Sequence, residues 1–354
     1  RSQPFLNRLT LRADMAGQPS KRITLHDVAR LSGVSSQTVS RVVNNYPYVS
    51  EDTRRRVLDA IQQLDYRPNR AARSLATRRS CMLGIVSFGI SYYGPAQMMA
   101  NIEQAAKLRG YSLAFSAINR VALDEMREAI DNLSDLSVDG LVLITPTTGI
   151  DVRELVGLCE GVPFVQIDTD PAARVPSVVI DQHYGSRLAT QHLIDLGHSA
   201  IGEISGPLHW FGAQARHESW EQTLLAAGLS PVMSVEGDWT PAGGYAAAHR
   251  LLDAGAQFTG LVVGNDQMAL GALRALRERR LRVPEDVSVV GFDDIPEATY
   301  FEPPLTTIRQ NFAALGEQSV EYLVALIDHP ETPVHQRVLH PQFIPRQSTQ
   351  APAR

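Results

Sequence analysis

The stretch from Ile23 to Asn45, ITLHDVARLSGVSSQTVSRVVNN, constrains the fold of this chain more than any other. Thr24 can cap a first helix, with Asp27 three residues later as the acidic partner of a capping box. Apolar residues then recur at helical spacing, with Leu31 on the predicted buried face. Gly33 permits a tight turn, after which a second helix can begin. The stretch predicts two short helices joined by that turn.

The second helix is predicted from Ser36 to Asn44, with Ser35 as its cap. Its valines turn one side inward, and polar side chains occupy the other side: Ser36, Gln37, Ser40 and Arg41. Such an outer face suits the DNA major groove, where Gln can pair with adenine and Arg with guanine. On turn, caps and spacing alone, an ordinary pair of packed helices without a DNA role fits equally well.

A third helix is predicted from Glu51 to Leu64, with Ser50 as its cap and Leu58 among its apolar residues. The segment from Asn69 to Ala76, NRAARSLA, defines no packing face. By its residues alone it is a helix-permissive linker or a plain tether. Residues 1–20 show no usable periodicity and are predicted to form a flexible leader.

Charge is divided unevenly along the chain. The formal net charge is −5, yet residues 21–80 hold 12 Lys and Arg against 5 Asp and Glu, whereas residues 81–354 hold 18 against 32. A small basic head on a larger acidic body fits a DNA-binding unit joined to a part that should not bind DNA. A length of 354 residues is itself enough for two or three domains.

After Cys81, short apolar runs alternate with amphipathic stretches, a pattern that predicts βαβ units and parallel sheets covered by helices on both faces. The predicted strands are 82–87, 112–117, 140–144, 162–167, 178–180, 201–205, 261–264 and 287–291. The predicted helices are 95–109, 123–136, 151–160, 183–196, 216–227, 242–254 and 267–279. Because the pattern restarts near Gly185, two doubly wound lobes are expected, with a ligand cleft at the carboxyl ends of the strands.

Several function classes find no support in the sequence. There is no G-x-G-x-x-G after a strand, no G-x-x-x-x-G-K-[ST] and no G-x-S-x-G, and the ten histidines form no H-E-x-x-H pair. Asp293 and Asp294 could suggest a carboxylate dyad for glycoside hydrolysis, but neighbouring residues at a strand end point in different directions. The two cysteines, Cys81 and Cys159, lie far apart and indicate neither a zinc site nor a disulfide. With no apolar run of membrane-spanning length and no signal peptide, we expect a cytoplasmic protein without a catalytic, metal or cofactor site.

The ends of three predicted strands carry polar side chains. Asp168, Asn265 and Asp293 each follow an apolar run, where a carboxylate or amide can form bidentate hydrogen bonds with vicinal hydroxyls. Arg216 is predicted to open a helix and to offer fork-shaped donors. Trp239 offers a flat apolar plate for the C–H face of a pyranose, and is expected opposite Arg216 across a ligand. Each type also has an ordinary structural role: Trp in the core, Asp as a helix cap, Arg in a surface ion pair.

The motif T-L-x-D-V-A-x-x-x-G-V-S-x-x-T-V-S-R-V-x-N resembles the helix-turn-helix that opens the LacI/GalR family of bacterial transcriptional repressors. The resemblance implies a DNA-binding domain at 21–68. It also implies a hinge helix within 69–80 that orders on operator DNA and inserts Leu75 into the minor groove. The DNA-contacting residues that it implies are Thr24, Ser35, Ser36, Gln37, Thr38, Ser40, Arg41, Asn44, Asn69, Ala72 and Leu75.

Four further segments, GDW, NDQMALGA, SVVGFDD and PPLTTIRQNF, resemble sugar-responsive repressors of the same family. This resemblance implies a periplasmic-binding-protein-like core at 81–348 with three crossings between its lobes, followed by a tail at 349–354. Lobe 1 would comprise about 81–180 and 311–339, and lobe 2 about 181–309 and 340–348. The effector-pocket residues that it implies are Tyr92, Asp168, Arg216, Trp239, Asn265, Asp293, Gln310 and Phe312. This chain departs from those repressors at Ser36, Tyr92, Tyr93, Trp210 and Phe211, which leaves the operator and the sugar open.

The sequence thus predicts a transcriptional repressor, not an enzyme, that binds a pseudo-palindromic operator in double-stranded DNA as a homodimer. A small sugar, galactoside-like or other, is the expected effector, and its binding would favour a lobe arrangement that separates the heads. A purine-type co-repressor response is the alternative within regulation. A solute-binding protein or a sugar-modifying enzyme is the alternative from another class, and would leave the basic head unexplained. Because the chain stops at Arg354 without leucine heptads, a dimer rather than a tetramer is expected.

Overall fold

The protein is described from a computed structural model. The described residues are 23–43, 46–66, 79–146, 152–159, 161–169 and 174–352. The chain divides into two compact units, residues 1–80 and residues 81–354. Each unit is described by itself below.

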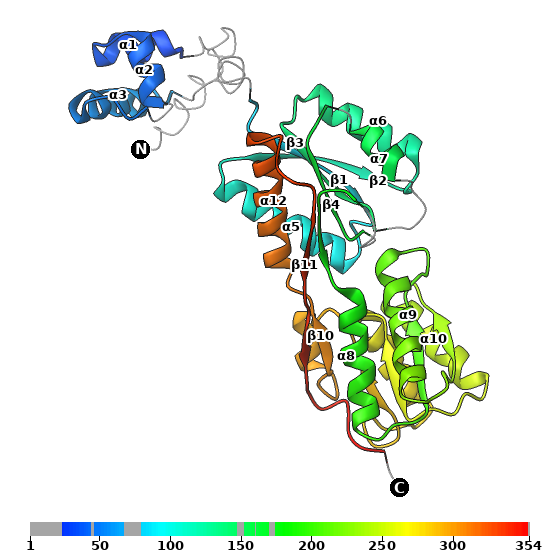
Figure 1. Ribbon diagram of the computed structural model, residues 1–354. Coiled ribbons are helices and arrows are strands. Elements are labelled where there is room, and N and C mark those ends of the chain that lie inside the picture. The colour runs from blue at the N-terminus through cyan, green and yellow to red at the C-terminus, as the bar shows by residue number, and fades with distance from the viewer. Residues whose placement is uncertain are drawn as a thin grey trace, which may run out of the picture. The chain divides into compact units, whose positions relative to one another are not determined.

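The N-terminal unit contains three helices, α1 (Leu25–Ser32), α2 (Ser36–Val43) and α3 (Glu51–Gln63) (Figure 1). The predicted capping box is present, because the Asp27 carboxylate accepts hydrogen bonds from the Thr24 N–H at 3.0 Å and from the Thr24 hydroxyl at 2.7 Å. Gly33 ends α1 with a φ of 66°, in the left-handed region. The Ser35 hydroxyl accepts from the Thr38 N–H at 3.1 Å and caps α2. The predicted helix-turn-helix is confirmed.

The core of this unit is small and built mainly from Val28, Val39, Val42 and Val57, which are nearly or fully buried. The predicted inward position of Leu31 is wrong, since its side chain is 49% exposed, and that of Leu58 is wrong for the same reason at 51%. In α1 the buried row runs through Val28, Ala29 and Ser32, which is the i, i+1, i+4 pattern of a helix face and leaves Leu31 beside it. Ser32 fits there because its hydroxyl donates to the Val28 carbonyl at 2.7 Å.

The first lobe of the C-terminal unit is built on a six-stranded parallel sheet in the order β11-β5-β4-β3-β1-β2. Helices α5 and α12 pack together on one face, and α6 and α7 on the other (Figure 1). The strands are β1 (Met82–Phe88), β2 (Ser112–Ile118), β3 (Gly140–Ile144), β4 (Phe164–Ile167), β5 (Ser177–Ile180) and β11 (Gln336–Leu339). The helices are α5 (Tyr93–Leu108), α6 (Leu123–Asp135), α7 (Val152–Leu158) and α12 (Phe312–Asp328).

The second lobe is built on a four-stranded parallel sheet in the order β7-β6-β8-β9. Helices α8 and α9 form one packed pair and α10 and α11 another. The strands are β6 (Ile201–Ser205), β7 (Ser234–Glu236), β8 (Gly260–Val263) and β9 (Ser288–Val290). The helices are α8 (Gln182–Asp195), α9 (Phe211–Ala226), α10 (Pro241–Asp253), α11 (Asp266–Glu278) and the 3-10 helix η3 (Pro296–Tyr300). The predicted α/β fold class is confirmed.

The chain passes between the lobes three times. It leaves the first sheet after β5 into α8, returns from β10 (Thr307–Arg309) into α12, and leaves again from β11 into β12 (Gln342–Ile344), which pairs antiparallel with β10. The sequence pattern predicted none of the elements beyond β9. The predicted tail, residues 349–354, contacts the second lobe, because the Gln350 N–H donates a hydrogen bond to the Ser288 hydroxyl at 3.0 Å. No helix in the described part of the chain is both long and apolar enough to cross a membrane.

Candidate functional site

A pocket lies in the C-terminal unit and is lined by residues of both lobes. Seven predicted effector residues line it: Tyr92, Asp168, Arg216, Trp239, Asn265, Asp293 and Gln310. Three of them lie where a parallel sheet is expected to bind its ligand, just beyond the carboxyl ends of strands. Asp168 follows β4, Asn265 follows β8 and Asp293 follows β9. The eighth, Phe312, is not among the lining residues. It is 6% exposed and its ring packs edge-on against that of Tyr93, with 6.1 Å between centroids.

Sequence reasoning did not assign several lining residues to the pocket: Tyr93, Gly94, Pro95, Met98, Pro146, Gln182, Trp210 and Gly212. Gln182 comes two residues after β5, but it is the first residue of α8, and only the residues directly after β4, β8 and β9 were predicted to reach the cleft. Tyr93 and Trp210 were noted only as departures from related repressors. Both begin or cap a helix, so no strand-end signal marks them.

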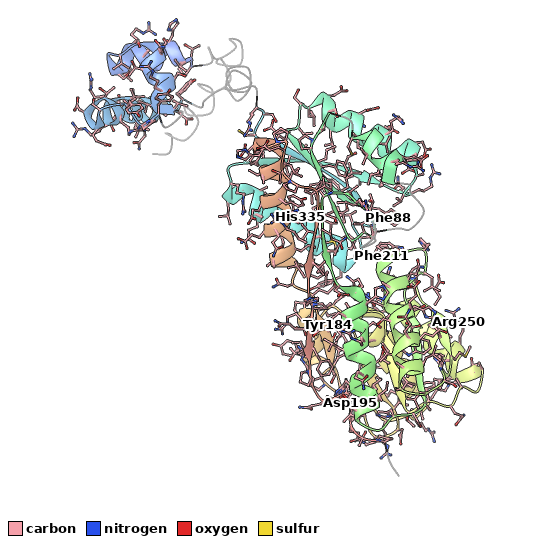
Figure 2. All side chains as sticks on the ribbon, viewed as in Figure 1. Phe88, Tyr184, Asp195, Phe211, Arg250 and His335 are labelled. Carbon is pink, nitrogen blue, oxygen red and sulfur yellow. The ribbon has the colours of Figure 1, made fainter. Side chains whose placement is uncertain are left out.

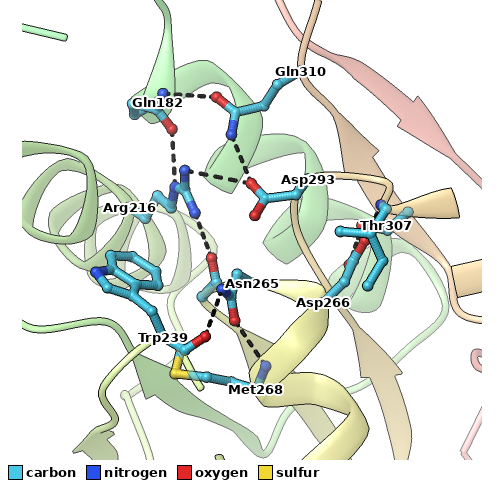
Figure 3. A network of polar contacts seen from close by, with 11 residues as sticks. Gln182, Arg216, Trp239, Asn265, Asp266, Met268, Asp293, Thr307 and Gln310 are labelled. Atoms are coloured by element: carbon cyan, nitrogen blue, oxygen red, sulfur yellow. Dashed lines mark hydrogen bonds and ion pairs between the residues drawn. The ribbon is translucent and has the colours of Figure 1, made fainter. Parts of the chain in front are cut away.

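Arg216 is the centre of a polar network that includes Gln182 and Gln310, which lie at the first two of the three crossings between the lobes (Figure 3). Its Nε donates to Gln182 Oε1 at 2.9 Å, and its Nη1 donates to the Gly264 carbonyl. Gln182 Nε2 donates to Gln310 Oε1 at 3.0 Å, and Gln310 Nε2 donates to Asp293 Oδ1 at 2.6 Å. Arg216 Nη2 lies 3.9 Å from the same Asp293 oxygen, which closes the ring of contacts.

The position of Arg216 differs from two predictions. It does not open a helix, because α9 begins at Phe211 and places Arg216 in its second turn. It does not face Trp239 across the pocket either, since its guanidinium carbon lies over that ring, 5.5 Å from the centroid, and 3.7 Å from the centroid of Phe292. The aromatic rings and the hydrogen bonds together fix the planar cation on one wall of the pocket.

Asp168 and Asp293 are strained and poorly solvated carboxylates. Their φ angles are 59° and 109°, a left-handed region that costs energy for a residue with a side chain and is concentrated at functional sites. Burial raises the pKa of each from 3.8 to about 6, although the positive charge of Arg216 opposes the rise. Asp293 Oδ1 accepts from Gln310, whereas Asp168 Oδ1 is closed to solvent and has no hydrogen-bond partner among the described residues. A ligand that donates a hydrogen bond would satisfy Asp168.

Asn265 and Trp239 are tied to each other. Asn265 Oδ1 accepts from the Met268 N–H at 2.8 Å and so caps α11, the ordinary structural role, while its Nδ2 donates to the Trp239 carbonyl at 3.1 Å. Trp239 has a φ of 70° and a buried Nε1 without a partner among the described residues. Its indole leaves no room for a side chain at Gly206, where a Cβ would lie 2.1 Å from Cη2. The indole is both part of the lobe's core and a wall of the pocket.

Aromatic side chains also line the pocket. Trp210 packs against Phe88, Tyr92 and Trp239, with ring centroids 5.1, 5.2 and 6.0 Å away. Tyr93 is another lining residue, and burial together with the nearby Asp293 carboxylate raises its pKa to about 12, so its phenol stays protonated. The pocket lining therefore combines two carboxylates with several aromatic rings.

In the N-terminal unit the predicted DNA-contacting residues divide by role. The Gln37 and Arg41 side chains are exposed on α2. Thr24 and Ser35 cap helices, and Ser36 Oγ is hydrogen-bonded to His26 Nδ1. The Thr38 and Ser40 side chains are half-buried. Four predicted residues lie outside the described residues and stay predictions: Asn44, Asn69, Ala72 and Leu75.

Comparison with protein families gives two matches. A model described as bacterial regulatory proteins of the lacI family matches residues 24–69, the segment that contains the helix-turn-helix. A model described as a periplasmic binding protein-like domain matches residues 190–349, which span most of the second lobe and the last two crossings.

Among the described residues no group of three or more His, Cys, Asp or Glu is placed to hold a metal ion.

Similar proteins extend along almost the whole chain. The lactose operon repressor of Escherichia coli K12 is 37% identical over 332 residues, which cover 94% of this chain and 92% of that protein. The repressor PurR of Haemophilus influenzae Rd is also 37% identical, over 335 residues that cover 93% and 99%. The structure of a Lac repressor dimer bound to operator and the anti-inducer ONPF has a TM-score of 0.85 at 36% identity, covering 94% of this chain and all of that one. A complex of the regulator CelR with cellobiose has a TM-score of 0.69 at 33% identity, covering 92% and 100%.

Proposed function

The chain belongs to the lacI family of bacterial regulatory proteins and is a DNA-binding repressor, and from that premise we propose that a small sugar controls its affinity for operator DNA. The observation that carries the sugar assignment is the set of polar side chains in the pocket lining. Two carboxylates, an arginine and three amide side chains line it together, and they come from both lobes. Vicinal hydroxyls both donate and accept hydrogen bonds, so a polyol can satisfy such a mixed set.

The DNA-binding part of the proposal rests on α2. Its exposed Gln37 and Arg41 can reach base edges in the major groove, and the rest of its outer face can contact the backbone. The chain acts as a dimer on a pseudo-palindromic operator, as the operator-bound Lac repressor dimer does. The hinge helix and the minor-groove contact of Leu75, which the family resemblance implies, stay part of this proposal.

Sequence identity does not distinguish a sugar effector from a purine effector, because the chain is 37% identical both to the lactose repressor and to PurR. The pocket favours the sugar. Asp168 Oδ1 needs a donor, and Asp293 adds a second buried carboxylate beside it. A flat base would present few donors to two carboxylates, whereas a hexose presents several hydroxyls. The CelR–cellobiose complex is a related case of a regulator with a sugar bound.

Coupling between pocket and DNA follows from the place of the amide side chains. Gln182 lies at the first crossing between the lobes and Gln310 at the second, and their side chains are hydrogen-bonded to each other. Gln182 also accepts from Arg216, and Gln310 donates to Asp293. A ligand that replaces these contacts acts directly on the segments that set the angle between the lobes. It shifts the population toward the lobe arrangement it binds better, and only to the extent of that difference in affinity.

The test combines a ligand screen with an operator-release titration. Thermal-shift measurements with hexoses, disaccharides and purine bases identify the effector, because a ligand of the folded state raises apparent stability. The DNA bound by the full chain is then titrated with that ligand for the parent, Arg216→Ala and Trp239→Ala. We expect both variants to hold operator at concentrations that release the parent, since losing a hydrogen-bonding arginine costs at least about tenfold in affinity. Stabilisation by purines and not by any sugar, or unchanged midpoints in both variants, would reject the proposal.

A further inference from the structure

Trp210, which occupies the position before α9, is a bulky part of the pocket lining. Its indole comes from the second lobe yet packs on Phe88 and Tyr92 of the first, and it is only 6% exposed. Tyr92 meets it at 89°, an edge-to-face arrangement that stabilises aromatic pairs. The ring is therefore a wall rather than a free stacking surface.

The structure leaves this wall little room to move. A Cβ at Gly89 would lie 2.6 Å from Trp210 Cη2, so the backbone of the first lobe runs directly against the indole. On the other side of the loop, the Phe211 N–H donates to the Pro146 carbonyl at 2.6 Å and fastens the start of α9 to the first lobe. Figure 2 labels Phe88 and Phe211 at the facing ends of the two lobes. Swinging the indole aside would require the backbone of both lobes to shift.

We propose that Trp210 sets the size of the effector, so that the pocket takes a single sugar ring whose glycosidic substituent is no larger than a methyl group. This inference rests on the proposed sugar response and adds its specificity. Free hydroxyls must remain hydrogen-bonded when buried, so they are directed to Asp168, Arg216 and Asp293. The substituent at the glycosidic carbon has no such need and is left to the aromatic side chains of the lining, among which Trp210 limits its size.

The experiment compares methyl and phenyl glycosides of galactose and glucose, in both anomers, by isothermal titration of the full chain. In the parent we expect the best methyl glycoside to bind at least about tenfold more tightly than its phenyl counterpart, because a packed pocket rejects excess volume. In Trp210→Ala the difference should vanish or reverse, since the space left by the indole admits the phenyl ring. Trp210→Phe should retain part of the discrimination. Leu225→Ala, on an exposed residue near the end of α9, is the matched control and should keep the parent's preference.

The outcomes separate this inference from the proposal beneath it. Equal binding of methyl and phenyl glycosides by the parent, or an unchanged ratio in a folded Trp210→Ala, overturns the role of Trp210 while leaving a sugar-responsive repressor intact. If Trp210→Ala does not fold, Trp210→Leu, which keeps an apolar side chain between the lobes, decides the same ratio. If neither the parent nor any Trp210 variant binds a sugar or glycoside, the proposed function fails and this inference fails with it.

Discussion

The recognition helix and the effector pocket solve opposite physical problems. On α2, the side chains proposed to read DNA are exposed, and the residues that hold the helix in place are different ones, Val39 and Val42 beneath it and Ser35 at its start. In the pocket, the side chains proposed to bind the effector are themselves buried and hydrogen-bonded to one another. The proposed binding residues are thus distinct from the residues that hold the fold in the head, whereas in the core they are the same residues.

The difference follows from what each site has to bind. DNA is a large external partner whose base edges lie in a groove, so readout needs side chains that project outward. A small ligand offers little area, and a pocket gains affinity by holding polar groups in place and away from water. Substitutions should therefore separate the two properties in the head and combine them in the core.

The largest effect is expected from Arg216→Ala. Removing the guanidinium leaves Asp293 and Asp168 buried with no positive charge against them, and such losses cost about 3–5 kcal/mol of folding stability. Urea unfolding of the full chain, followed in the transition of the core, measures the change. Arg274→Ala is a suitable control, because Arg274 forms its ion pair with Glu278 on the surface and should change stability by less than about 1 kcal/mol. A change in Arg216→Ala as small as that in Arg274→Ala would show that the pocket side chains do not stabilise the core.

The reverse combination is expected on α2. Gln37→Ala and Arg41→Ala should each lower operator affinity by about 1–3 kcal/mol, because each removes a contact to base edges. Non-specific binding should change much less, since phosphate contacts dominate it. Thermal unfolding of both variants should match the parent, because neither side chain is buried. Equal losses on operator and on random DNA would show that these residues contact only the backbone.

A third prediction concerns pH and applies to the core. Burial raises the pKa of Asp168 and of Asp293 from 3.8 to about 6. The folded protein therefore retains protons between those values that the unfolded chain releases. The contribution of these groups to stability falls as pH rises through about 6. Effector hydroxyls that donate to the carboxylates need the ionised form, so effector affinity should rise over the same interval.

The measurement is a pair of titrations at pH 5 and pH 7, one of unfolding and one of effector binding. We expect affinity to increase by up to about tenfold while the stability of the ligand-free core decreases. Asp168→Asn, which cannot ionise, should weaken both trends. If affinity and stability change in the same direction, the carboxylates do not accept hydrogen bonds from the effector.

Much of this arrangement could be predicted from sequence, and the reason differs between the two regions. In the head, the signals are local: Thr24, Asp27, Gly33 and Ser35 cap or turn the chain within a few residues of themselves. In the core, β4, β8 and β9 are buried along their whole length and appear as apolar runs, so the residue after each run could be assigned to the cleft. Asp168, Asn265 and Asp293 were found in this way.

The errors share a cause. Helix α9 was predicted to begin at Arg216 because no Ser, Thr, Asp or Asn precedes Phe211, and Trp210 stands at the capping position without a side-chain hydrogen bond. Gln182, Tyr93 and Trp210 reach the pocket from helix starts rather than strand ends. The elements after β9 were not predicted from pattern: β10, β11 and β12 are only three or four residues long and β11 and β12 are partly exposed, and the 17-residue helix α12 was missed as well. Tertiary contacts between distant segments decide these positions, and periodicity does not record them.

The smallest expected effect distinguishes structural from direct roles within the head. Ser35 is among the residues predicted to contact DNA, yet its hydroxyl accepts from the Thr38 N–H and caps α2. Ser35→Ala should lower the stability of the head by about 1 kcal/mol, and Ser35→Asp, which can also cap, should restore it. A negative charge beside phosphates would weaken DNA binding if Ser35 touches the backbone. Thermal unfolding and operator affinity of the two variants therefore give different answers. If Ser35→Asp is stable and binds operator as the parent does, Ser35 only positions the recognition helix; if it is stable and binds poorly, Ser35 also contacts the DNA backbone.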